Sequence, residues 1–180
     1  MIAAREALAL LREGNRRFVA NQTTTVHQAR REALLDGQEP FAIVLGCSDS
    51  RVPAELVFDQ GFGDLFVIRV AGNIVAPSQV GSVEFAASRF GTRLVVVLGH
   101  SQCGAITATL EELLGKSSNS SRNLRSIVDR VRPSVETLLA GRKDLDMNVV
   151  VHEAVRANVR ASASHLRHGS ELLERLIRED

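Results

Sequence analysis

The sequence predicts an α/β fold, with a mainly parallel central sheet flanked by helices and an N-terminal helical arm. Three short apolar runs, at 41–46, 65–70 and 93–99, are rich in branched or aromatic residues and bounded by Gly, Asp or Pro. Such runs are typical of buried strands. Helical patterns separate and follow them, and strands that alternate with helices indicate a parallel sheet.

The helices are predicted from apolar periodicity and from residues that start or stop a helix. Residues 4–20 place Leu8, Leu11 and Phe18 on one face at helical spacing, which predicts the amphipathic arm. Between the second and third strands, a helix is expected to begin with Ser78 as its cap and to stop at Gly91. Further helices are predicted over 26–36, 104–114, 122–140 (with a break near Pro133), 147–161 and 163–178.

Composition excludes several classes of function. The net charge is +1, which gives no broad attraction to nucleic acid or to an anionic membrane. Aromatic residues make up 4% of the chain, without Trp or Tyr, so base-stacking platforms are not expected. No segment approaches the roughly 20 apolar residues that span a bilayer, and the N-terminus lacks the apolar core of a signal peptide. We therefore expect a cytoplasmic protein, in which the two cysteines are thiols.

Polar residues suited to chemistry follow the first and third predicted strands directly. The first strand runs into Cys47-Ser48-Asp49-Ser50-Arg51, and the third into Gly99-His100-Ser101-Gln102-Cys103-Gly104. Parallel sheets build their ligand sites beyond the carboxyl ends of the strands. The two segments are therefore expected to meet at one edge of the sheet.

Together these segments offer the donors of a zinc site. Cys47 and Asp49 point the same way if the chain is extended, and a strand-to-helix turn can bring His100 and Cys103 together. Two sulfurs, a nitrogen and an oxygen suit tetrahedral zinc better than copper or iron. Either cysteine alone is more typical of core packing, and Asp49 and Arg51 could form a simple loop ion pair. The coincidence of both segments favours the metal.

Asp49 leaves two arrangements open. With its carboxylate on Arg51, zinc has three protein ligands and a free position, as catalytic sites have. With its carboxylate on zinc, the site is closed.

Four stretches of sequence together resemble the beta-class carbonic anhydrases: CSDSRVP at 47–53, DLFVIRVAGN at 64–73, SVEFAASRFGT at 82–92 and VVVLGHSQCGA at 95–105. The resemblance extends over roughly residues 4–115 and continues more loosely after 122. CxDSR followed at this distance by GHxxCG is a highly specific combination. It implies reversible hydration of carbon dioxide to bicarbonate by zinc-bound hydroxide, with Cys47, His100 and Cys103 as zinc ligands and Asp49 and Arg51 as catalytic dyad.

The resemblance also implies residues that contact the substrate. The backbone of Gly104 would border carbon dioxide or bicarbonate, Gln38 would orient it, and Phe66 and Val80 would lie near pocket walls that a neighbouring subunit completes. For Gln38 a solvated loop residue, and for Phe66 a core residue, are the alternatives.

The resemblance implies one domain over 1–180, with an N-terminal arm (1–36), a zinc-site core (40–115) and a helical C-terminal part (120–180). Family members usually continue into further strands, whereas this chain ends at Asp180, so the edge beside the third strand is expected to be unpaired. The apolar stripe of the arm predicts a homodimer or homotetramer, with no nucleic acid or membrane partner. A catalytically silent zinc protein and a hydrolase of carbonyl sulfide or carbon disulfide remain alternatives.

Overall fold

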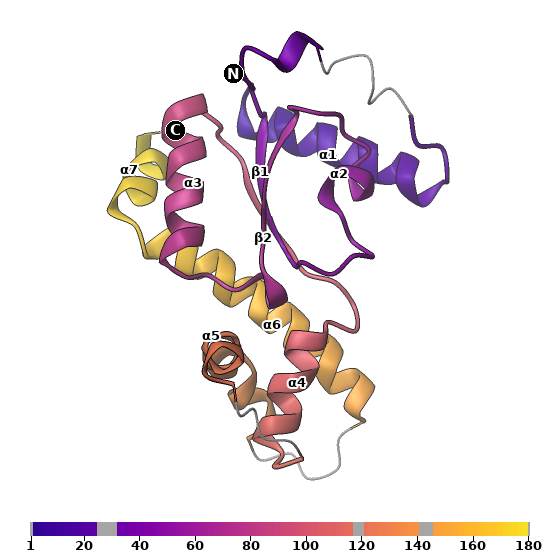
Figure 1. Ribbon diagram of the computed structural model, residues 1–180, viewed down its shortest axis with the longest axis vertical. Coiled ribbons are helices and arrows are strands. Elements are labelled where there is room, and N and C mark those ends of the chain that lie inside the picture. Colours follow the sequence, from indigo (N-terminus) through magenta and orange to yellow (C-terminus); the bar gives the residue numbers. More distant parts are fainter. Residues whose placement is uncertain (1, 25–31, 117–120, 141–145, 180) are drawn as a thin grey trace. The chain divides into compact units, whose positions relative to one another are not determined.

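The computed structural model describes residues 2–24, 32–116, 121–140 and 146–179 (Figure 1). It divides into two compact units. The first comprises Met1–Leu45, Ser50–Ile68 and Pro77–Val96, and the second Gly46–Asp49, Arg69–Ala76 and Val97–Asp180. The predicted division into an arm, a zinc-site core and a helical part stays a prediction.

A parallel sheet of three strands confirms the predicted α/β class. The strands are β1 (Ala42–Gly46), β2 (Leu65–Arg69) and β3 (Val95–Leu98), in the order β2-β1-β3. All five residues of β1 are buried, which explains why the central strand reads as an unbroken apolar run. Within the described residues β3 pairs only with β1 and is an edge strand.

Helix α1 (Ala4–Val19) packs on the short helix α2 (Ala54–Val57) inside the first unit. Leu11 is buried, and the Asn15 side chain donates a hydrogen bond to the Val57 carbonyl at 3.0 Å. A side chain at Gly14 would collide with the Phe58 carbonyl. Part of the stripe that we expected to face a partner is therefore covered by this chain, while Phe18 on the same helix is exposed.

The first unit also holds the 3-10 helix η1 (Glu32–Leu34) and helix α3 (Pro77–Phe90). Residues 26–31 of the helix predicted over 26–36 lie outside the described residues. Of the remainder, the structure forms only the 3-10 helix η1. Ser78 does not cap α3. It lies inside the helix and donates to the Gln79 side chain, because Pro77 takes the first helical position that its fixed φ suits. Gly91, at φ 64°, ends the helix as predicted.

The second unit contains the 3-10 turn η2 (Ala71–Asn73) and the helices α4 (Gly104–Leu113), α5 (Arg122–Leu139), α6 (Met147–His168) and α7 (Glu171–Glu179). Figure 1 shows α4 and α5 beside α6, and these helices pack on one another. Helix α5 continues through Pro133 without the predicted break, because Val131 and Val135 on either side are fully buried. The predicted division near residue 162 is also wrong, since α6 continues to His168 before Gly169.

The hydrophobic core of the second unit surrounds both cysteines. Its buried members are Cys47, Ile74, Cys103, Ile106, Leu110, Val131, Val135, Val150 and Ala154. Across the described residues, the helices are too short or too polar to traverse a lipid bilayer.

Candidate metal centre

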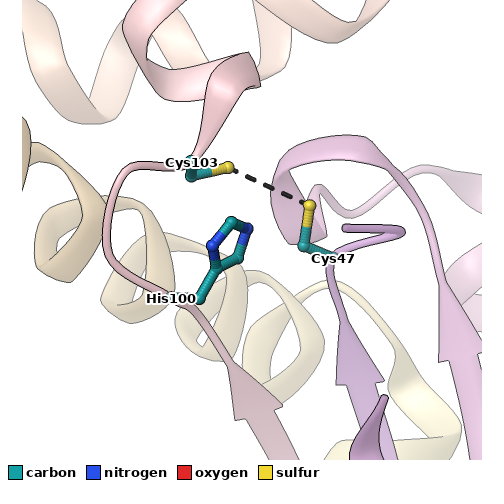
Figure 2. Close-up of side chains that lie close together, drawn as sticks. All are labelled: Cys47, His100 and Cys103. Atoms are coloured by element: carbon teal, nitrogen blue, oxygen red, sulfur yellow. Dashed lines mark hydrogen bonds between the residues drawn. The ribbon is translucent and has the colours of Figure 1, made fainter. Parts of the chain in front are cut away.

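Three side chains of the second unit converge on one point (Figure 2). The ligand atoms of Cys47, His100 and Cys103 all lie within 4.8 Å of one another, and the two sulfurs are 4.0 Å apart. In Figure 2 the imidazole of His100 faces the gap between the sulfurs. The structure therefore brings together the three donors that the sequence placed at the ends of two strands.

The three residues are positioned by the ends of regular elements. Cys47 follows β1 directly, His100 comes two residues after β3, and Cys103 is the N-cap of α4. Between the last two, Gln102 has a φ of 53°, a left-handed conformation that turns the chain from strand to helix. A Cβ at Gly99 would lie 2.5 Å from Cγ2 of Val159 on α6, so this approach requires glycine.

The imidazole of His100 is oriented for metal binding. Its Nδ1 lies 2.9 Å from the Ser101 carbonyl, which can only accept a hydrogen bond, so Nδ1 carries the proton. Nε2 is buried and finds no hydrogen-bond partner among the described residues. A buried lone pair without a partner is costly, and a metal ion would satisfy it.

The two thiols differ strongly in acidity. The neighbouring Cys103 thiol holds the pKa of Cys47 well below its ordinary range against the opposing effect of burial, and the nearby His100 side chain and the Gly72 N–H act in the same direction. The Gly72 nitrogen lies 3.3 Å from the Cys47 sulfur. The same pairing, together with burial, raises the pKa of Cys103. This pairing favours the thiolate form of Cys47, which is the form that binds metals.

Asp49 lies beside this group without joining it. Its Oδ2 is 3.9 Å from Nε2 of His100, and it is not among the three described residues whose ligand atoms gather. The guanidinium of Arg69 fixes the backbone here, with Nε donating to the Cys47 carbonyl at 3.1 Å and Nη2 to the Asp49 carbonyl at 2.6 Å. Whether Asp49 becomes a zinc ligand stays a prediction.

The other predicted site residues are spread over both units. Gly104 belongs to the second unit, is exposed, and begins α4 with open space around it. Arg51 and Gln38 are exposed residues of the first unit. Phe66, also there, is half-buried and packs against Phe85 and Phe90 with ring centroids 6.2 and 6.0 Å away. The predicted roles of these residues in the reaction stay predictions.

Sequence reasoning missed the residues that hydrogen-bond to the backbone and sulfur of the candidate metal ligands or to the turn beside them. Arg69 and Gly72 act on the Cys47 loop, as described above. Asn158 and Ser162 on α6 bond in turn to the Gly72 and Asn73 carbonyls. Periodicity could have found Asn158 and Ser162, because they are polar residues that continue the four-residue spacing of the buried positions of α6. The helix break expected near residue 162 concealed this pattern.

The donor set fits zinc. Two sulfurs and one imidazole nitrogen are the ligands that zinc favours, and three protein ligands with a remaining position are typical of a catalytic site. The orphaned Nε2 of His100 and the thiolate character of Cys47 give this fit physical support.

The sequence pattern of the carbonic anhydrase family matches residues 42–180, so the chain belongs to that family. Its relatives place it in the beta class. It is 47% identical to the carbonic anhydrase of Mycolicibacterium smegmatis over 135 residues, which cover 74% of this chain and 64% of that protein. It is 44% identical to carbonic anhydrase 2 of Mycobacterium tuberculosis over 136 residues, with the same coverage. The chain thus spans less than two thirds of the length of these relatives.

Solved structures show the same fold. The beta-carbonic anhydrase CcaA superimposes with a TM-score of 0.69 at 28% identity, covering 97% of this chain and 80% of that one. The beta-carbonic anhydrase of Coccomyxa gives a TM-score of 0.73 at 22% identity, covering 96% of this chain and 76% of that one.

Proposed function

We propose that this chain is a zinc-dependent carbonic anhydrase that hydrates carbon dioxide reversibly to bicarbonate. The observation that carries the proposal is the convergence of Cys47, His100 and Cys103, in a chain of the carbonic anhydrase family. When bound, zinc supplies a Lewis acid that makes water a nucleophile near neutral pH; the three-His carbonic anhydrase is the standard example of this chemistry. The burial of both cysteines supports the proposal, because a dry site strengthens electrostatic effects on the reactants.

Asp49 and Arg51 are proposed to manage the proton of the reacting water. The Asp49 carboxylate is partly exposed and lies beside the His100 ring. From this position it is proposed to accept a hydrogen bond from the reacting water. Arg51 is proposed to orient that carboxylate and so to keep it off the metal. Gly104, Gln38 and Phe66 are proposed to border the substrate.

Metal analysis combined with a hydration assay tests the proposal. The wild type should hold one zinc per chain and hydrate carbon dioxide, whereas Cys103→Ala and His100→Ala should lose both properties. His152→Ala is the matched control, because His152 is an exposed histidine on α6. One zinc per chain without hydration, even at alkaline pH, would refute the enzyme and favour a silent zinc protein.

We also propose that the chain assembles as a homodimer or homotetramer. Leu10, Phe18 and Val19 of α1 remain exposed at 44%, 38% and 73% in the single chain, which supports a partner surface on this helix. Sedimentation at micromolar concentration tests this proposal, and a monomer would contradict it.

A further inference from the structure

Helix α6 buries two polar side chains within an otherwise apolar stripe. Its buried residues recur every four positions and are Val150, Ala154, Asn158, Ser162 and Leu166. Asn158 is 2% exposed and Ser162 4%. Burial of an amide or a hydroxyl is costly unless it is hydrogen-bonded, so the partners of these two groups explain their presence.

Both side chains bond to the turn η2. Nδ2 of Asn158 donates to the Gly72 carbonyl at 2.7 Å, and Oγ of Ser162 donates to the Asn73 carbonyl at 3.0 Å. The turn has an uncommon backbone, because Gly72 has a φ of 70° and Asn73 a φ of 42°. Two consecutive carbonyls of a left-handed turn are therefore fixed by two donors one helical turn apart.

The same turn contacts a metal ligand. The Gly72 N–H donates to the Cys47 sulfur at 3.3 Å, while the Gly72 carbonyl accepts from Asn158. Gly72 thus connects α6 to the Cys47 sulfur. A Cβ at Gly72 would lie 3.0 Å from Cβ of Ala105, so the turn has little room to shift.

We propose that Asn158 and Ser162 are positioning residues of the metal centre. By fixing η2 they aim the Gly72 N–H at the Cys47 sulfur. A hydrogen bond to a metal-bound sulfur withdraws charge from it. Residues that hydrogen-bond to metal ligands in this way set the orientation of the ligands and the affinity for the metal. The inference rests on the proposed metal site and adds to it the residues that tune one of its sulfurs.

A merely structural role predicts a different outcome. If the two side chains only stabilise packing, their removal lowers the melting temperature and leaves the environment of the bound metal unchanged. If they position the donor, their removal also changes the charge on the sulfur. The sulfur-to-cobalt charge-transfer absorption of the Co²⁺-loaded protein reports that charge directly.

The test compares Asn158→Leu and Ser162→Ala with matched variants on the same helix. Asn148→Leu and Ser164→Ala are the controls, because both side chains are exposed. Co²⁺ affinity is measured by competition with a chelator, together with the near-ultraviolet absorption and the melting temperature. We expect Asn158→Leu to weaken Co²⁺ binding about 10-fold or more and to shift the charge-transfer band. Ser162→Ala removes only one hydroxyl, so it should change the Co²⁺ affinity and the charge-transfer band in the same direction but by less. The controls should match the wild type.

Two results separate the proposals. If Asn158→Leu and Ser162→Ala melt earlier but keep wild-type affinity and absorption, the positioning role is overturned and the proposed function is unaffected. If the wild type binds Co²⁺ and Zn²⁺ without hydrating carbon dioxide, the proposed function is overturned, whereas a band shift in the variants still supports the positioning role. Should Asn158→Leu fail to fold, the decision rests on Ser162→Ala.

Discussion

The close approach of α6 to Gly99 can be tested by adding a single methyl group. In Gly99→Ala, the new Cβ would lie 2.5 Å from Cγ2 of Val159 and 3.2 Å from Cγ1 of Val155. Carbon atoms pack best at about 3.5–4.0 Å, so the shorter contact overlaps by at least about 1 Å. Overpacking of this kind costs about 1–3 kcal/mol, which corresponds to a fall in melting temperature of roughly 2–12 °C for a chain of this size.

The overlap should also affect the metal, because Gly99 precedes His100 directly. Movement of the loop away from α6 displaces the imidazole, so we expect zinc affinity to fall together with stability. Gly81→Ala in α3 is the matched control, since a Cβ there meets nothing within 4 Å. Calorimetry and chelator competition measure the two effects.

A second substitution sharpens the test. Val159→Ala removes the methyl group that collides, so the double variant Gly99→Ala/Val159→Ala should be more stable than the sum of the single effects predicts. If Gly99→Ala melts and binds zinc like the wild type, the packing argument is refuted. Strict additivity in the double variant would refute it as well.

Three further predictions concern charge. Arg69→Ala should weaken zinc binding, because the Cys47 and Asp49 carbonyls lose their shared donor. Arg69→Lys should retain only part of the wild-type zinc affinity. Arg160→Ala, at an exposed arginine, serves as control in the same chelator competition. Burial raises the pKa of Asp59, but hydrogen bonds from Arg17 and Thr24 outweigh it and hold the pKa below its usual value. The stabilisation by the Asp59 carboxylate is therefore present above about pH 4 and lost as the pH falls through the lowered pKa. Urea unfolding should show that the free energy of unfolding falls with acid pH more in the wild type than in Asp59→Asn. Finally, two thiolates donate more charge to zinc than imidazoles do, so the hydration rate should rise from about pH 7 to about pH 9; a flat stopped-flow profile would contradict this.

Much of the fold, and the convergence of the candidate metal ligands, could be predicted because local sequence determines them. An unbroken apolar run identifies a central strand such as β1, and the carboxyl ends of parallel strands meet at one edge. That geometry was enough to bring Cys47 and His100 together. Gly91 was recognised as a helix stop because few residues tolerate its backbone.

The supporting contacts could not be predicted, because they join residues that are distant in the chain. Asn158 and Gly72 are separated by 86 positions, and no spacing rule connects them. The start of α3 was misplaced because a serine beside a proline offers two competing helix signals, and Pro77 prevailed.

The candidate metal ligands come from parts of the second unit that are far apart in sequence. Cys47 belongs to the four-residue segment Gly46–Asp49, whereas His100 and Cys103 belong to the long segment Val97–Asp180. An ion held by all three would act as a removable cross-link that closes a loop of about 50 residues. By the chain-entropy relation for disulfides, such closure stabilises the folded state by on the order of 4 kcal/mol. We therefore expect stripping of the metal to lower the free energy of unfolding and to make the loop after β1 more accessible to proteases.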